Sequence, residues 1–290
     1  MKHQKRVAVS TWCTDDYRDY IGIEELSNSI SYFHPEIDHH VTPGPKDIEG
    51  IWIMAPLGLE IADDYDMVMH IDGDAVVVGD LSEMIESDAA IIGTKNNNAF
   101  GKAGSHRGIT TPLLSYDSEN DCYVPQGSSI PIETWLNAGI IGANGRDFWK
   151  AWDDLNMSIV RRGVGRLPPP FGDENDTLNL IFHSGRFSTH LVDSDESDVY
   201  YNIATLWGDD PNDHWESWRQ LYMKGDGVFL DDPVSGTPKQ VKILHQAGGS
   251  LSNTLNKEHG GFRNWLRQAV PREVGEFIDH VSSASSKQQG

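Results

Sequence analysis

The stretch YDMVMHIDGDAVVVGDL, residues 65–81, places two aspartates one residue apart between two apolar runs. Residues 67–71 and 75–78 are almost entirely apolar, as expected of buried strands in an α/β sheet. Asp72 and Asp74 lie between them, and carboxylates so close repel each other unless a cation or a shared proton relieves the repulsion. The stretch therefore predicts a buried strand that ends at a charged ligand.

Strands and helices alternate on both sides of this stretch. We expect strands over residues 6–11, 39–42, 67–71, 75–78, 89–94, 138–143, 189–192 and 241–244, and helices over 23–33, 48–61, 146–155 and 175–182. Residues 96–133 are rich in Gly, Asn, Ser and Pro, which predicts a long irregular segment. The alternation predicts an α/β domain with a mainly parallel sheet flanked by helices, in which ligands bind beyond the carboxyl ends of the strands.

The composition disfavours several classes of function. The chain has 44 acidic and 23 basic residues and a net charge of −21, which repels nucleic acids. It has no signal peptide pattern, and no apolar run reaches the ~18 residues that a membrane span requires. Its two cysteines, Cys13 and Cys122, lack C-x-x-C spacing and are expected to be free thiols. We expect a cytoplasmic protein, of a cell or of a virus-infected host.

The segment of Asp72, Gly73 and Asp74 suits a divalent cation. In an extended chain the two carboxylates point the same way, roughly 6–7 Å apart. Oxygen ligands favour Mg²⁺ or Mn²⁺, an added imidazole favours Mn²⁺, and Gly73 lets a bulky ligand approach the backbone. A solvated turn is the alternative for a D-x-D in so acidic a chain. Asp80 is expected to cap the turn that follows.

Residues 70–81 (HIDGDAVVVGDL) resemble the D-x-D segment of GT-A-fold glycosyltransferases, most of all the glycogenin-like, or LPS-galactosyltransferase-like, retaining family. Three further segments are similar to segments of that family and follow in its order. They are NAGIIGAN at 137–144, ENDTLN at 174–179 and HQAG at 245–248. The resemblance covers about residues 5–250, and four segments in order are far more specific than any one of them.

The resemblance implies a metal-dependent enzyme with a GT-A (Rossmann-like) fold. Such an enzyme transfers a sugar from a nucleotide-sugar donor, here expected to be a UDP-sugar, to an acceptor hydroxyl with retention at the anomeric carbon. The implied ligands of Mn²⁺ (or Mg²⁺) are Asp72, Asp74 and His245. The implied donor-binding residues are Thr11, Trp12, Cys13, Asp72, Gly73, Asn137 and Gly248.

The same resemblance places the reacting sugar above residues 174–179. Asn175 or Glu174 would lie beneath the anomeric carbon. An inverting enzyme would instead need a carboxylate base, for which Asp173, Glu174 and Asp176 are candidates. Acidic residues at this position also favour a helix N-terminus, so the alternative is a purely structural role.

Three regions follow from these assignments. Residues 1–205 would form the nucleotide-sugar-binding core, and residues 206–280 would complete the metal and acceptor site. The low-complexity residues 281–290 are expected to be a disordered tail. The aromatic residues of the C-terminal region suit either sugar stacking or packing.

The chain departs from the family pattern at three places. The late H-x-x-G element continues as GSLSN instead of Lys-Pro-Trp, and residues 51–60 lack the usual arginine. Lys95, Lys102 or Arg107 would then have to neutralise the diphosphate. Asn175 stands where the family has glutamine.

Two other functions remain open at this point. A phosphatase of the haloacid dehalogenase type also uses an apolar run followed by D-x-D, but on its first strand and with a small hydroxyl residue where this chain has Val76. A non-catalytic nucleotide-sugar-binding module would share the fold and the metal site. A phage-type transferase that acts on DNA bases is disfavoured by the negative charge.

Overall fold

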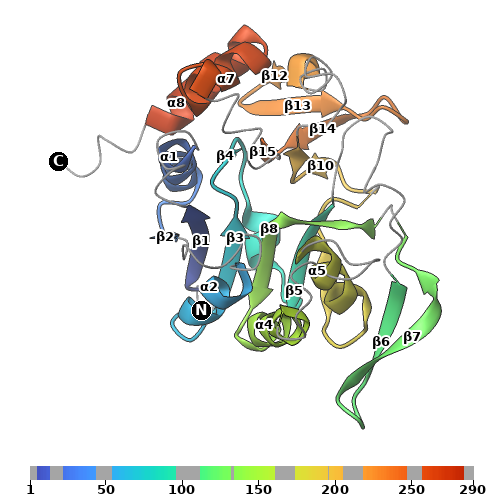
Figure 1. Ribbon diagram of the computed structural model, residues 1–290. Coiled ribbons are helices and arrows are strands. Elements are labelled where there is room, and N and C mark those ends of the chain that lie inside the picture. Colours follow the sequence, from blue (N-terminus) through green and yellow to red (C-terminus); the bar gives the residue numbers. More distant parts are fainter. Residues whose placement is uncertain are drawn as a thin grey trace.

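The computed structural model describes residues 5–13, 22–43, 54–95, 112–131, 134–160, 174–194, 196–204, 218–246 and 257–283. Its centre is a six-stranded sheet (Figure 1). In spatial order the strands are β2 (Asp38–Pro43), β1 (Val7–Cys13), β3 (Met67–Ile71), β8 (Leu136–Asn144), β5 (Ile91–Lys95) and β9 (Thr189–Leu191). Only β8 runs against its neighbours β3 and β5, and the other pairs are parallel. The predicted α/β fold with a mainly parallel sheet is confirmed.

Helices cover both faces of this sheet. They are α1 (Ile23–Phe33), α2 (Met54–Ile61), the short α3 (Ser82–Glu86), α4 (Asp147–Val160) and α5 (Glu174–His183). Successive strand residues point to opposite faces, so Val68 packs with Trp149 and Trp152 of α4, while Met69 packs with Leu26 of α1. Two apolar cores therefore hold β3 from both sides, which explains why every residue of that strand is buried.

Two smaller sheets pack beside the central one. A three-stranded sheet has the order β11 (Ile203–Ala204), β15 (Ile243–His245) and β4 (Ala75–Val77). A four-stranded sheet has the order β10 (Val199–Tyr200), β14 (Pro238–Val241), β13 (Gly227–Asp231) and β12 (Tyr222–Lys224). β4 follows β3 directly in the chain, so it links the central sheet to the C-terminal region.

Two C-terminal helices close a third core. They are α7 (Phe262–Ala269) and α8 (Arg272–Ser283), and they pack with the smaller sheets. Trp218, in a short 3₁₀ turn (Trp218–Gln220), and Trp265 of α7 are at most 1% exposed, and their rings meet edge to face at 5.1 Å. For these two residues the packing interpretation is confirmed, because a buried ring cannot stack on a sugar. Within the described residues, no helix has the length and apolar character needed to cross a membrane.

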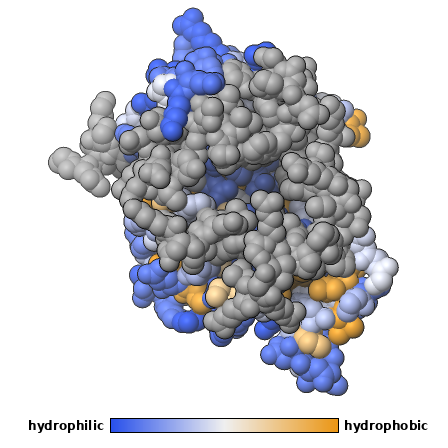
Figure 2. Space-filling view, in the orientation of Figure 1, coloured by the Kyte–Doolittle hydropathy of each residue, from blue (hydrophilic) through white to orange (hydrophobic). Residues whose placement is uncertain are grey.

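Several element predictions need correction. Residues 112–129 are not irregular but form a hairpin of β6 (Pro112–Asp117) and β7 (Cys122–Ser129), which Figure 2 shows with hydrophobic residues along its body. The expected single strand at 241–244 is instead β14 and β15, separated at Lys242. The helix α8 extends to Ser283, so residues 281–283 belong to the fold and not to a tail.

The described part of α2 begins at Met54, and the expected helical residues before it lie outside the described residues. Pro56 is the third residue of this described part.

Candidate metal centre

Asp72 and Asp74 lie on the turn between β3 and β4. Ile71 ends β3, and the Ala75 N–H donates a hydrogen bond of 3.2 Å to the Asp72 carbonyl, which closes the turn. The Asp72 N–H donates to the carbonyl of Gly139 on β8 at 2.8 Å. The chain is therefore not extended between the two aspartates, and the prediction based on an extended geometry is wrong. The turn lets both carboxylates face the same third residue.

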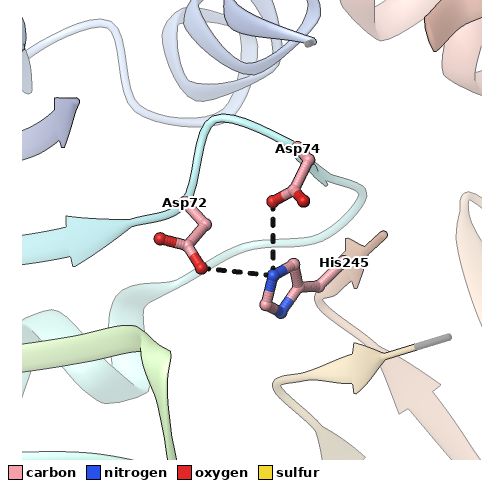
Figure 3. Close-up of side chains that lie close together, drawn as sticks. All are labelled: Asp72, Asp74 and His245. Carbon is pink, nitrogen blue, oxygen red and sulfur yellow. Dashed lines mark ion pairs between the residues drawn. The ribbon is translucent and has the colours of Figure 1, made fainter. Parts of the chain in front are cut away.

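That third residue is His245, at the end of β15. β15 pairs with β4 in antiparallel fashion, and the pairing sets His245 opposite Ala75. One residue further, the Gln246 N–H donates to the Asp74 carbonyl at 2.8 Å. The imidazole Nε2 of His245 lies 3.3 Å from Asp72 Oδ2 and 3.3 Å from Asp74 Oδ1 (Figure 3). The predicted convergence of these three side chains is confirmed.

The electrostatics of the cluster follow from burial and mutual attraction. Burial disfavours the charged ring of His245, but hydrogen bonds to Asp72 and Asp74 outweigh it and raise the pKa of His245 to about 10. Burial also raises the pKa of Asp74. For Asp72 the hydrogen bonds from His245 and His70 outweigh burial and lower its pKa. A proton on His245 thus holds the two carboxylates together, and a divalent cation would compete with that proton.

The surroundings of the cluster fit a cation of this kind. Two carboxylates and an imidazole can each offer one ligand atom, and these atoms lie within 4.8 Å of one another. Oxygen ligands with one imidazole suit Mn²⁺ or Mg²⁺. Gly139 borders the cluster so closely that a Cβ there would lie 2.4 Å from Asp72 Oδ2 and 2.6 Å from the His245 ring. A glycine is therefore required beside this site.

Two amide side chains of α5, those of Asn175 and Asn179, join this helix to the start of β8, and the amide of Asn137 bonds within β8 itself. Asn137 Oδ1 accepts from the Gly139 N–H, and Asn175 Oδ1 accepts from the Ala138 N–H, both at 2.8 Å. Asn179 holds Leu136 by accepting from its N–H and donating to its carbonyl. Asn137 is thus part of the strand that borders the metal cluster, and the bond to Ala138 brings Asn175 to that strand.

Two acidic residues of α5 accompany Asn175. Glu174 and Asp176 are each only 6% exposed. Their burial beside β8 is consistent with either of the expected roles, helix N-terminus or reacting group. Asp173 and Gly248, together with Lys102 and Arg107, lie outside the described residues.

The end of β1 holds the predicted nucleoside-binding residues. Thr11 is fully buried, and its hydroxyl donates to the Ile71 carbonyl at 2.7 Å and meets His39 Nε2 at 2.9 Å. Cys13 is also buried, whereas Trp12 is partly exposed. Thr11 thus joins β1 to the end of β3, which leaves Trp12 as the residue whose side chain is most accessible to a ligand.

Two residues near the cluster were not predicted as site residues. His70 contacts Asp72 from within β3, and Gly139 borders Asp72 from β8. A signal for His70 is present in the sequence, because residues two apart on a strand share a face. For Gly139 the only sequence signal is its place in the NAGIIGAN segment.

No protein-family model matches the chain, and no curated protein matches its sequence. Among solved structures, the chain is similar to the galactosyltransferase LgtC in complex with donor and acceptor sugar analogues. The TM-score is 0.48 and the sequence identity 16%, and the match covers 93% of this chain and 99% of LgtC. The bifunctional glycosyltransferase WbbM matches with a TM-score of 0.48 and 14% identity over 96% of this chain and 52% of that one. A glycosyltransferase involved in glycosylation of the major capsid of PBCV-1 matches with a TM-score of 0.47 and 12% identity over 88% and 98%. At such identities and scores, the function has to be inferred from the site itself.

Proposed function

We propose that this chain is a metal-dependent glycosyltransferase of the GT-A fold. It would transfer a sugar from a nucleotide-sugar donor, a UDP-sugar, to an acceptor hydroxyl with retention. The observation that carries the proposal is the meeting of Asp72, Asp74 and His245 beyond the end of β3. His245 lies far from Asp72 and Asp74 in the chain, and the order of the sequence segments implies that the three residues meet.

The cluster would hold Mn²⁺ or Mg²⁺ and the diphosphate of the donor. A bound divalent cation supplies Lewis-acid stabilisation to a leaving diphosphate. Two carboxylates keep the site attractive to a cation although the donor is itself anionic. Gly139 lets the backbone of β8 lie close to the cluster, where a Cβ would overlap Asp72 and His245. Gly73 adds no side chain to the turn between the two carboxylates, which lets a bulky ligand approach the backbone there.

The remaining residues of the proposed donor site come from three elements. The end of β1 supplies Trp12 to the nucleoside, with Thr11 and Cys13 behind it. Asn137 and Gly248 would contact the donor near the metal. Lys95, at the end of β5, is the described basic residue among those expected to neutralise the diphosphate.

The start of α5 would face the sugar. Asn175 is oriented by its bond to Ala138 and is the proposed residue beneath the anomeric carbon in a retaining reaction. Glu174 and Asp176 are the carboxylates available for proton transfer if the reaction inverts. We expect the cytoplasm as the compartment, where the free thiols Cys13 and Cys122 stay reduced.

A specific observation separates this function from a haloacid dehalogenase-type phosphatase. Such an enzyme uses the first aspartate of D-x-D as a nucleophile. Here both oxygens of Asp72 contact a histidine, one His70 and the other His245. This arrangement holds the Asp72 carboxylate in place as a metal ligand. It also assigns a role to His245, whereas the phosphatase mechanism gives this residue none.

The test is a panel of nucleotide sugars incubated with the protein and Mn²⁺, with release of the nucleoside diphosphate as the readout. We expect release with one donor, and loss of at least 100-fold in rate for Asp74→Asn, because one ligand carboxylate is lost. Asp80→Asn is the matched control, since Asp80 lies in the same stretch but its carboxylate bonds the N–H and hydroxyl of Ser82 and lies 3.2 Å from His34 Nε2, outside the metal cluster. The anomeric configuration of the product, measured by NMR, reports retention or inversion.

Three outcomes would contradict the proposal. Donor binding without release of the diphosphate would identify a binding module. Hydrolysis of a generic phosphate ester that depends on Asp72 would favour the phosphatase. An Asp74→Asn variant as active as the wild type would remove the metal cluster from the reaction.

A further inference from the structure

A second histidine, His70, contacts the metal cluster from inside the central sheet. It is the fourth residue of β3 and is fully buried. Its Nε2 lies 2.9 Å from Oδ1 of Asp72, two residues along the chain. An aspartate side chain is ionised at neutral pH, and an ionised carboxylate only accepts hydrogen bonds. The His70 Nε2 is therefore the donor, and its N–H points at Oδ1.

The two oxygens of Asp72 are thereby divided between two histidines. Oδ1 accepts from His70, and Oδ2 faces His245 and Asp74 inside the cluster. A carboxylate whose one oxygen is held in this way offers a metal only the other. The Asp72 backbone is fixed as well, because its N–H is bonded to Gly139. Its side chain then has one orientation before any ion arrives.

The position of His70 does not suit a role in packing. It lies on the face of β3 that includes Val68 and beside Ile141 of β8, both members of an apolar core. Its second ring nitrogen, Nδ1, is buried and has no hydrogen-bond partner among the described residues. A buried polar atom without a partner costs free energy, so an apolar side chain would serve the core better. The bond to Asp72 is the interaction that a histidine adds here.

We propose that His70 is a positioning residue of the metal site, which holds Oδ1 of Asp72 so that Oδ2 alone binds the cation. The inference rests on the metal site of the proposed function, but not on the sugar-transfer reaction. Partners of metal ligands that act in this way contribute about 10- to 100-fold to metal affinity.

The test compares two amides of different length in the otherwise unchanged protein. In His70→Gln the amide nitrogen can take the place of Nε2 and donate to Asp72. In His70→Asn the amide is one carbon shorter and does not reach Oδ1. The readout is Mn²⁺ affinity measured by calorimetry and by the EPR signal of free Mn²⁺, with no donor present. We expect His70→Asn to bind at least 10-fold more weakly and His70→Gln to stay within about threefold of the wild type.

A third variant, His70→Leu, separates metal binding from stability. It removes the donor and the partnerless Nδ1 together, so we expect weaker Mn²⁺ binding without loss of thermal stability. His34→Leu is the matched control. His34 is also buried, and its Nε2 accepts from the Leu81 N–H at 2.9 Å, so this variant should lose stability but keep its metal affinity.

The proposal is overturned if His70→Asn or His70→Leu binds Mn²⁺ as tightly as the wild type. It is also overturned if His70→Gln is as weak as His70→Asn, or if the wild type binds no Mn²⁺. If the wild type binds Mn²⁺ and the His70 variants show the expected affinities, but the protein transfers no sugar, the role of His70 stands. Only the proposed function is then contradicted.

Discussion

Gly139 is the residue where the backbone of β8 comes closest to the carboxylates of the cluster. Its position is set by two bonds, since its N–H donates to Asn137 Oδ1 and its carbonyl accepts from the Asp72 N–H. A Cβ there would overlap Asp72 Oδ2 at 2.4 Å, a distance that real contacts do not reach. Neither backbone can move away without breaking these bonds, so the carboxylate would have to turn.

We therefore expect Gly139→Ala to weaken Mn²⁺ binding and slow the reaction by at least 10-fold, measured by calorimetry and by diphosphate release. The matched control is Gly275→Ala in α8. There a Cβ would meet its nearest neighbour, a methyl group of Val270, at 3.6 Å, an ordinary contact. Alanine in a helix is favoured over glycine, so this variant should gain about 0.5–1 kcal/mol of stability and keep its affinity. Equal effects of the two substitutions would contradict the role of Gly139.

At the scale of single residues, the D-x-D stretch was informative because its pattern is local. Asp72 and Asp74 follow an apolar strand, and their chemistry could be inferred without knowing the fold. The role of His70 could not be inferred from the sequence, because a histidine within an apolar run is equally compatible with a buried structural residue. The distance to Asp72 Oδ1 decides between these interpretations.

At the scale of elements, His39 joins three parts of the fold beneath the proposed nucleoside site. It lies on β2, its Nδ1 contacts Ser27 of α1 at 2.8 Å, and its Nε2 contacts Thr11 of β1 at 2.9 Å. Thr11 in turn donates to the end of β3. Burial, and to a lesser degree the charge of His40, lowers the pKa of His39 to about 4. The folded protein therefore holds the His39 ring in its neutral form.

The sign of the pH dependence follows from this shift. Between pH 6.5 and the folded pKa of about 4, the unfolded chain binds a proton that the folded chain does not. Acidification therefore favours unfolding, by about 1.5 kcal/mol between pH 6.5 and pH 5 for this one group. We expect urea denaturation to show a smaller loss of stability over this interval for His39→Gln. If the wild type and His39→Gln lose the same stability over this interval, His39 does not contribute to the pH dependence of stability.

The elements that sequence patterns missed share a physical reason. The hairpin of β6 and β7 is only half-buried or exposed over most of its length, so it lacks the apolar alternation that identifies a strand. Its order comes from contacts such as the Tyr116 and Tyr123 rings, 5.6 Å apart, and from Arg186, which lies over Tyr116. The contact with Arg186 depends on a residue distant in the chain and leaves no local pattern.

At the scale of the whole molecule, α8 connects the C-terminal region to the N-terminal half. Its buried residues include Val274 and Ile278, and Asn28 of α1 donates to the Ser282 carbonyl at 2.7 Å. α8 lies against α1 at one edge of the molecule in Figure 1. The core that α8 closes also contains Leu244, the residue before His245. The C-terminal helices thus support the strand that carries a metal ligand.

We expect Ile278→Ala to lower the free energy of unfolding by about 2–5 kcal/mol, because it leaves a cavity in this core. Ile278 is 2% exposed. The control is Val234→Ala, since Val234 is 94% exposed and its truncation should change stability by less than about 0.5 kcal/mol. Chemical denaturation measures both. A loss below about 1 kcal/mol for Ile278→Ala would show that α8 packs only loosely.

The sequence by itself determined the class of fold and the central chemistry. Apolar runs separated by helical spacing predicted the mainly parallel sheet, and the burial of all of β3 agrees with its apolar composition. Both depend on the local order of residues, because strand and helix periodicities are properties of a short segment. The resemblance in segment order added His245, although nothing near His245 in the chain indicates a metal site.

Only the tertiary structure decided how these residues meet. The register of β15 on β4 sets His245 opposite Ala75, and the turn at Gly73 directs both carboxylates to one imidazole. The missing Cβ of Gly139 lets β8 lie against Asp72 and His245. Each depends on the pairing of segments distant in the chain, and a shift of one residue in that pairing would turn His245 to the other face of its sheet. Geometry of this kind is created by packing, which is why no short stretch of the sequence contains it.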